Sequence, residues 1–413
     1  MFSLLRNWFF PFFLIFTILA EPIFHAFCSA VGISVESGML SYVFIGIFIV
    51  SIALFAKDCS RGWKNLNVNK VISILLLLLF LYYASSIFQS TIPQLYYTYF
   101  LVFGSKCIPA CLIGMHLARD GNKILQKVDI ILPIFIIVVG IPLGVLGYKA
   151  AMLGEVLKDP ESSSLNYQIY SYYMAEFYVY CAYYLFFSSI QNKLIYKCLR
   201  IPMFALLFFF AICCLMGGGR GAFVFILFAT IFVFIEMYKL RRLSNRAIIL
   251  IIFVTGVIFS YVANKIGVFD SAGFERIAIY LTDDSSREDL RDAAISSFFD
   301  SPIIGHGLGS VWWEIGFYSH NMIFDAMVEA GVIGLALILY LGFTLVYRMS
   351  KLCRYNSCYL FLMLMFFEQA TKGMFSGYYF GLYHLWMIFG LTMVFPDKYY
   401  DNINGSSVFE FKN

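Results

Sequence analysis

Charged residues are scarce in this sequence. Asp, Glu, Lys and Arg make up 13% of the 413 residues, against about 25% in a typical soluble domain. Apolar residues reach 61%, and the mean hydropathy is +0.80. A strong net charge is also missing, because 29 Lys and Arg residues face 25 Asp and Glu residues, which leaves +4. This composition excludes a soluble secreted, nuclear or cytosolic enzyme, and the small net charge gives no indication of nucleic-acid binding.

The sequence also lacks internal repeats, low-complexity tracts and Pro-, Ser- or Gly-rich linkers, which argues against a string of soluble domains. Its 10 cysteines lie in apolar runs or at basic loops, so a disulfide framework is not expected. No Cys/His spacing matches a zinc site. Cys107 and Cys111 are one helical turn apart and are interpreted as packing residues.

What the chain does contain is a series of long apolar runs separated by short polar stretches. A bilayer crossing takes about 20 apolar residues in a helix, and the runs lack the two-residue alternation of barrel strands. We therefore expect an all-α polytopic integral membrane protein with about 12 transmembrane helices. The predicted spans are 9–31, 38–56, 69–88, 95–118, 128–148, 171–190, 200–216, 221–238, 246–264, 321–347, 355–371 and 375–395.

Two details of this assignment have alternatives. The gaps at 216–221 and 371–375 are so short that either pair of runs could be a re-entrant hairpin instead. The first run resembles a signal peptide, but it is too long, contains Glu21 and lacks a small-residue cleavage site. An uncleaved first span is therefore favoured.

The positions of Lys and Arg predict the orientation. If the N-terminus is cytoplasmic, every short loop on that side is basic and the short outer loops nearly lack positive charge, as the positive-inside rule requires. Both termini are then expected in the cytoplasm. The basic inner loops lie at 57–70, 119–127, 193–200, 239–246 and 348–354.

Two outer loops, 149–170 and 265–320, are long. Loops of this length are uncommon unless they are functional, so chemistry is expected on the outer face. The chain is accordingly divided into 1–264, nine N-terminal transmembrane helices; 265–320, a large outer loop with short helices; and 321–413, three C-terminal transmembrane helices and a cytoplasmic tail.

A short helix is predicted inside the larger loop. Ser285 and Glu288 fit a capping box, and Asp300-Ser301-Pro302 marks the end of the helix. Arg287 and Arg291 are four residues apart and share one face. Two guanidinium groups in this arrangement could hold a diphosphate; alternatively, both pair with neighbouring acidic residues on a solvated helix.

Two glycine-rich stretches are further candidates. Gly305-His306-Gly307-Leu308-Gly309 permits close backbone approach to a ligand, although any tight loop uses the same pattern. Gly217-Gly218-Gly219-Arg220-Gly221 lies between two predicted spans at the outer side. Arg220 beside free backbone N–H groups would suit an anion, whereas the alternative is an interfacial turn with a snorkelling Arg.

His320-Asn321 opens the tenth predicted span, and Glu329 follows within it. An imidazole can abstract a proton near neutral pH, and an ionisable residue within a span is a functional candidate by default. Trp312, Trp313 and Tyr318 precede His320 and could stack on sugars, although most aromatic residues of the chain are interpreted as packing and interface residues.

Together these residues resemble the signature region of the O-antigen polymerase/O-antigen ligase superfamily. The family pattern is an Arg on an outer helix, a Pro-x-x-Gly-x-Gly turn, a His-Asn pair, and Gly-x-x-Gly nine residues later. The chain has Arg287, Pro302-Ile303-Ile304-Gly305-His306-Gly307, His320-Asn321 and Gly331-Val332-Ile333-Gly334. Arg220 matches the family's second Arg. The resemblance is close over 287–334, and the twelve-span arrangement fits the remainder.

The resemblance implies a GT-C-like glycosyltransferase of the bacterial inner membrane with a periplasmic active site. The donor would be a glycan on undecaprenyl pyrophosphate, and the acceptor a second lipid-linked glycan. Arg220 and Arg287 would hold the diphosphate leaving group, and His320 would activate the acceptor hydroxyl or orient the diphosphate. Asn321, Trp313 and Tyr318 are assigned to substrate binding, and Arg291 and Glu329 are added to this set from their spacing alone, not from the resemblance. No metal or other cofactor is expected, since guanidinium groups can neutralise phosphate charge; a chain-length regulator would be a further partner.

The form Ser-His-Asn-x7-Glu-x-Gly and the short tail favour an O-antigen polymerase, with an O-antigen ligase that transfers the glycan to lipid A-core as the alternative. The paired Arg-x10-Gly motifs of some polymerases are absent, because Phe298 and Pro302 follow Arg287 and Arg291 at that spacing. A lipid-linked sugar flippase or transporter is the other class considered. Transporters usually have related halves with ionisable residues at the midplane, whereas the candidates here converge on one outer loop.

Overall fold

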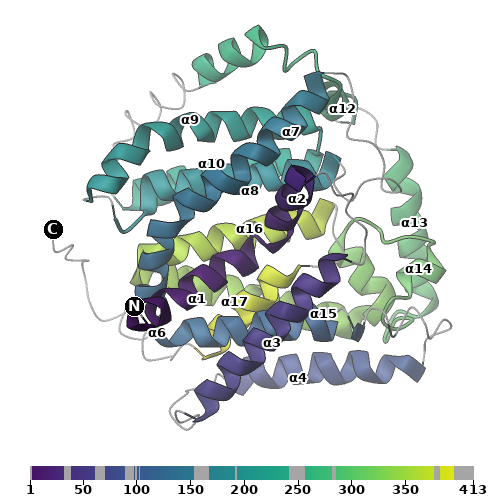
Figure 1. The fold of residues 1–413 in the computed structure, drawn as a ribbon. Helices are drawn as coiled ribbons and strands as arrows, with labels where there is room; N and C mark the ends of the chain where they lie inside the picture. Colours follow the sequence, from purple (N-terminus) through teal and green to yellow (C-terminus); the bar gives the residue numbers. More distant parts are fainter. Residues whose placement is uncertain are drawn as a thin grey trace. The chain divides into compact units, whose positions relative to one another are not determined.

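The computed structural model of the chain describes residues 2–31, 39–60, 70–88, 97, 100–101, 103–152, 167–190, 193–240, 256–280, 285–375 and 382–394. Helices account for nearly all of this part of the chain, and it contains no strand (Figure 1). The all-α prediction is therefore confirmed for the described residues. Each of the twelve predicted spans contains described helix.

Several helices have the length and composition of membrane spans. Four described stretches qualify: Phe103–Ala151, Leu194–Gly217, Arg220–Lys239 and Met322–Tyr355. Helices α1 (Phe2–Ile18) and α2 (Ala20–Val31) meet at a 78° bend and form a fifth candidate if they make one span. Shorter apolar helices lie at Tyr42–Lys57, Ser73–Ser85 and Tyr383–Val394. The protein is thus a polytopic membrane protein, while the count of twelve and the GT-C fold stay predictions.

Two predicted inner loops lie wholly inside helices. The loop expected at 348–354 is the last part of α15 (Met322–Tyr355). The loop expected at 119–127 lies inside α6 (Ile108–Phe135), which departs from helical geometry at Asp120 (φ −132°, ψ 30°). The helix continues beyond this kink because Leu125, Val128 and Leu132 recur at helical spacing and are each no more than 1% exposed. Buried packing of this face therefore outweighs the polar residues from which the loop was predicted.

The chain forms two compact units, 1–42 with 124–283 and 43–123 with 284–413. The first unit, called unit 1, is built around α8 (Tyr167–Phe187), which packs along α9 (Leu194–Gly217) and α10 (Arg220–Lys239). Helix α7 (Ile141–Met152) packs on α9. The predicted division at residues 264 and 320 concerns membrane topology rather than compactness and stays a prediction.

The second unit, called unit 2, is centred on α15 (Met322–Tyr355). The helices packed against α15 are α4 (Lys70–Ser85), α13 (Ser285–Asp300), α16 (Leu360–Phe375) and α17 (Tyr383–Val394). Close helix contacts depend on small residues: a Cβ added at Gly114 would collide with the Met387 carbonyl of α17, and one at Gly390 with the Cys111 carbonyl of α6. Helix α3 (Met39–Ser60) contributes most of its length to this unit.

Candidate active site

Residues 302–309, called the glycine loop, are hydrogen-bonded into a break of helix α15. The break is at Gly331 (φ 58°, ψ −162°), a conformation that is essentially restricted to glycine. The N–H of His306 donates to the Val328 carbonyl at 2.9 Å, and the N–H of Gly307 donates to the Glu329 carbonyl at 2.9 Å. In return, the N–H of Val332 donates to the Pro302 carbonyl at 2.8 Å.

The two motif glycines lie where these backbones touch. A Cβ at Gly331 would be 2.5 Å from the Ile303 carbonyl carbon, and a Cβ at Gly305 would collide with the backbone of Glu329. Gly305 also has a positive φ of 65°. The sequence left open whether these glycines approach a ligand or form a tight loop; the structure shows that they approach the protein's own helix.

The Glu329 side chain belongs to the same junction. It is fully buried, and its Oε1 accepts the N–H of Gly309 at 2.9 Å. A buried carboxyl group that accepts a backbone N–H ties that backbone to the helix, because a buried N–H left without an acceptor costs free energy. Sequence analysis predicted a substrate-binding residue at this position, and the contact described in the structure is with the glycine loop.

The end of α4 supports the glycine loop through two further hydrogen bonds. The Tyr82 hydroxyl donates to the Ile304 carbonyl. Ser86 lies in the 3-10 turn Ser86–Phe88, and its Oγ accepts the N–H of Leu308 at 3.1 Å. Both partners are more than 200 residues away in sequence, so no local pattern predicts them.

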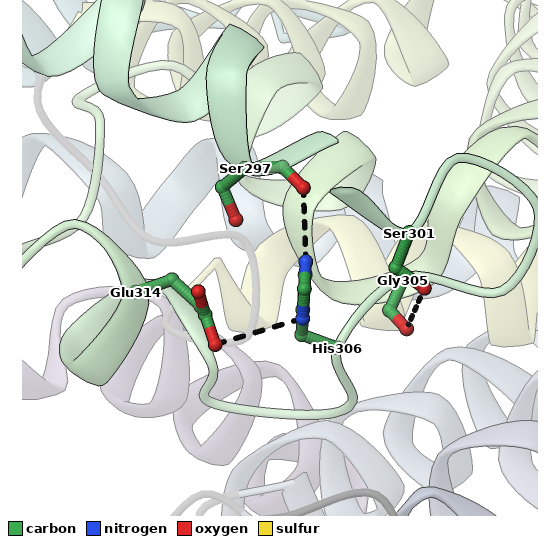
Figure 2. Close-up of polar contacts among 5 residues, drawn as sticks. All are labelled: Ser297, Ser301, Gly305, His306 and Glu314. Carbon is green, nitrogen blue, oxygen red and sulfur yellow. Dashed lines mark hydrogen bonds and ion pairs between the residues drawn. The ribbon is translucent and has the colours of Figure 1, made fainter. Parts of the chain in front are cut away.

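His306 joins the glycine loop to two neighbouring helices (Figure 2). Its Nε2 lies 2.9 Å from the Ser297 carbonyl in the last turns of α13, and its Nδ1 lies 3.5 Å from Oε1 of Glu314 in α14 (Val311–Glu314). Immediately before the loop, the Ser301 hydroxyl donates to the Gly305 carbonyl at 2.8 Å. The imidazole therefore fixes the end of α13 relative to α14.

Helix α13 carries the predicted cation pair. It runs from Ser285 to Asp300, which confirms both predicted ends. Arg291 is half-buried, while Arg287 lies in the first turn and its side chain is outside the described residues. Ala294, one turn after Arg291 and fully buried, packs against Val311 and Val328. This packing fixes which face of α13 is turned towards α15.

His320 has a strained backbone. Its φ of 60° is the only positive value at a non-glycine residue in the described part of the chain, and such a conformation costs about 1–3 kcal/mol. Ring centroids of Tyr318 and Phe317 lie 4.5 Å and 5.4 Å from the imidazole. Strain that the surrounding structure maintains is characteristic of functional positions.

Hydrogen bonds at the start of α15 maintain this conformation. The Asn321 side chain accepts the N–H of Ile323 at 2.9 Å and caps the helix. Asp325 is fully buried and its Oδ1 accepts the N–H of Ser319 at 2.7 Å, while the Ser319 hydroxyl donates to the Asn321 carbonyl at 2.9 Å. His320 is thus held between two anchored residues. Sequence analysis did not assign Asp325, although an acidic residue in a first helical turn is a typical capping signal.

The aromatic residues before His320 form a cluster. Trp312 contacts Phe317 and Tyr318 at 4.9 Å and 5.6 Å between centroids, and Tyr318 also contacts His320. Tyr318, Trp312 and Trp313 were all noted in the sequence, and Trp312 is the tryptophan described in contact with these rings. Trp313 lies on α14 and its indole Nε1 has no hydrogen-bond partner among the described residues.

Arg220, in unit 1, is the first residue of α10. Gly218 ends α9 in the left-handed region (φ 77°), and the N–H of Gly219 donates to Ser171 Oγ at 3.0 Å. A Cβ at Gly218 would be 2.9 Å from the Cα of Gly273 in α12 (Ala272–Tyr280). The glycines before Arg220 therefore allow α12 and α8 to pack directly on the turn.

The sequence gave no indication of a second cation near this turn. The guanidinium carbon of Arg276, on α12, lies 3.8 Å from the ring centroid of Tyr167. Tyr167 is one helical turn before Ser171, whose hydroxyl accepts the Gly219 N–H. Arg276 and Arg220 thus belong to the same end of unit 1, and the cation–π contact restrains Arg276 there.

Within the described ranges, no group of three or more His, Cys, Asp or Glu residues is arranged to hold a metal ion. Unit 1 contributes the guanidinium groups of Arg220 and Arg276, and unit 2 contributes that of Arg291 and the imidazole of His320; each of these groups suits an anionic ligand.

The helices and the composition define an integral membrane protein. Residues 205–339 match the family described as O-antigen ligase. The matched stretch contains Arg220, α13, the glycine loop, His320 and the break in α15, and the match supports the O-antigen polymerase/ligase superfamily, whose members are glycosyl-transferring enzymes. The resemblance drawn from the motifs is thereby confirmed. Among curated proteins, no significant match is found.

Proposed function

We propose that the protein is an O-antigen polymerase that joins undecaprenyl-pyrophosphate-linked oligosaccharide units at the periplasmic face of the inner membrane. The observation that carries this proposal is the strained His320, anchored by Ser319 and Asn321 within the stretch that matches the family. We propose the orientation predicted from the basic loops, with both termini in the cytoplasm.

The reaction exchanges one bond at the anomeric carbon of the donor sugar. An acceptor hydroxyl oxygen forms the glycosidic bond while the bond from that carbon to the phosphate oxygen breaks, and undecaprenyl diphosphate leaves with the electron pair. Arg220 and Arg287 bind the diphosphate, with Arg291 as a third cation, because guanidinium groups stabilise the charge that develops on the leaving group. His320 takes the hydroxyl proton, or orients the diphosphate while a phosphate oxygen takes it.

The remaining residues act on the substrate or on its surroundings. Tyr318 and Trp313 stack on sugar rings of the donor or acceptor. Asn321 keeps an amide N–H₂ for a sugar hydroxyl while its oxygen caps α15. Glu329 acts by holding the glycine loop, consistent with its bond to the Gly309 N–H.

An O-antigen ligase is the second candidate, favoured by the description of the matching family. Ligase and polymerase share the donor and differ in the acceptor, which is lipid A-core for the ligase. Lipopolysaccharide from a deletion strain separates them: core with a single repeat unit identifies a polymerase, and bare core with accumulated lipid-linked polymer identifies a ligase. Unchanged long chains in the deletion strain would contradict both.

The catalytic assignment is tested by complementing that strain with Arg220→Ala, Arg287→Ala and His320→Asn. Asn tolerates the positive φ of residue 320, so this variant removes the imidazole without adding backbone strain. We expect normal amounts of protein in the membrane and a loss of long glycan chains, with transfer reduced about 10²–10³-fold. Lys265→Ala, at an exposed cation of unit 1, is the control that keeps the chains. Long chains in the three test variants would overturn the assignment.

A further inference from the structure

Helices α8, α9 and α10 of unit 1, together with residues 256–259, line a cavity of about 320 Å³. Its described walls are made of aliphatic and aromatic side chains apart from Tyr178 and Thr230. The hydroxyls of these two are 2.7 Å apart, and Thr230 Oγ1 also lies 2.7 Å from the Ile226 carbonyl. Because the two hydroxyls bind each other and the helix, the cavity offers an apolar surface and suits an apolar ligand.

The cavity is elongated along α10. Phe223, Leu227, Thr230 and Phe234 all line it, and their spacing of three to four residues places them on one face of the helix. Phe234 comes eleven positions after Phe223, which corresponds to about 16 Å of helix. A site of this length along one helix fits an extended hydrocarbon chain better than a compact ring-shaped ligand.

Some side chains in the cavity wall are also exposed on the outer surface of the helices. Leu227 and Phe204 line it and are nevertheless 48% and 46% exposed. The neighbouring Phe228 and Ile231 on α10 are also exposed, at 60% and 55%. Exposed apolar residues on a membrane span face lipid, so a lipid chain could enter from the bilayer without crossing water.

The same face of α10 leads to a phosphate-binding candidate. Arg220 is the first residue of α10 and comes three residues before Phe223, the first residue of α10 in the cavity wall. A cation thus lies beside one end of an apolar cavity. This arrangement fits a lipid that carries a phosphate group at the end of a long hydrocarbon chain.

We propose that this cavity binds the isoprenoid chain of the lipid-linked donor whose diphosphate is bound by Arg220. The proposal rests on the proposed function, and it adds a site that holds the lipid portion of the donor. The isoprenoid chain lies against Leu207, Ala211 and Leu227, with its diphosphate end towards the first turn of α10.

The test uses the full-length protein in nanodiscs of phosphatidylethanolamine and phosphatidylglycerol. The probe is a polyprenyl diphosphate with a diazirine in its isoprenoid chain, and crosslinked peptides are mapped by mass spectrometry. We expect crosslinks on α9 and α10 at the cavity wall, removed by unlabelled undecaprenyl diphosphate. Displacement to the same extent by added phosphatidylglycerol would identify an ordinary acyl-chain site and overturn the proposal.

Variants that fill the cavity make the test specific. Ala211→Phe and Leu207→Phe add volume at the wall and are expected to reduce crosslinking at least about tenfold. Ile231→Phe, on the lipid-facing side of α10, is the matched control and should crosslink as the wild type does. If Ala211→Phe fails to fold, the crosslinking of Leu207→Phe alone decides whether the isoprenoid chain occupies the cavity. Full crosslinking in a folded, filled variant contradicts the proposal.

The two proposals fail separately. Crosslinking in the cavity without any glycan transfer supports the lipid site and counts against the polymerase and ligase functions. Transfer of glycan with crosslinks confined to other helices supports the function and overturns the cavity assignment.

Discussion

At the scale of single residues, the most informative feature is how His320 is held. Its positive φ costs about 1–3 kcal/mol, which the neighbouring contacts must offset. Those contacts are the Asp325 bond to Ser319, the Asn321 cap, and the rings of Phe317 and Tyr318. The position of the imidazole therefore depends in part on Ser319 and Asp325, which do not themselves touch substrate in the proposed mechanism.

Asp325 provides a test of this dependence. Asp325→Ala removes the acceptor of the buried Ser319 N–H, which should destabilise the protein by about 1–3 kcal/mol and shorten the glycan chains. Asp325→Asn keeps an acceptor oxygen and should restore most of the chain length. Thermal unfolding in detergent and the lipopolysaccharide ladder measure the two effects. Equal chain lengths in Asp325→Ala and the wild type would show that His320 does not need this anchor.

At the scale of elements, the break in α15 is the central feature of the candidate site. Helix α15 has the hydropathy of an uninterrupted span, yet Gly331 interrupts it and the glycine loop bonds to the carbonyl and N–H groups around the break. These bonds satisfy backbone groups that the interruption would otherwise leave without partners inside an apolar helix.

Gly331→Ala tests this element directly. The added Cβ would be 2.5 Å from Ile303 backbone atoms, and the positive φ disfavours any other residue, so we expect a loss of at least about 3 kcal/mol and little protein in the membrane. Gly342→Ala in the same helix is the matched control: its Cβ meets nothing within 4 Å, and the protein level should be equal or higher. Similar losses in both variants would refute the role of the break.

Local signals predicted some elements well and others not at all. The sequence signals at Ser285-Glu288 and Asp300-Ser301-Pro302 predicted the ends of α13 correctly, because helix ends are set by nearby residues. The break at Gly331 was not predicted, because hydropathy is insensitive to φ and the glycine pattern is compatible with several contacts. The loop bonds to Tyr82 and Ser86, and the stacking of Arg276 on Tyr167, are non-local and have no counterpart in sequence periodicity.

At the scale of the whole molecule, the family match and the compact units divide the chain differently. The match at 205–339 runs through the last part of unit 1 and into the first part of unit 2 that follows residue 284. Each unit contributes its own candidates: Arg220 and Arg276 in unit 1, and α13 with His320 in unit 2. The orientation of both units in the membrane is predicted from the basic loops alone. This prediction of topology therefore concerns the whole chain.

Cys198 is a natural reporter of that topology. It is an exposed cysteine near the beginning of α9, in the basic loop predicted to be cytoplasmic. A membrane-impermeant maleimide should leave Cys198 unlabelled in intact spheroplasts and label it after permeabilisation, as measured by mass spectrometry on the peptide that contains residue 198; Cys198→Ser should remove the label from that peptide. In a Cys198→Ser background, Lys265→Cys should be labelled without permeabilisation, because residue 265 begins the loop predicted to be periplasmic. Labelling of Cys198 from the outside would invert the orientation and place Arg220 and His320 on the cytoplasmic side, where a periplasmic donor is out of reach.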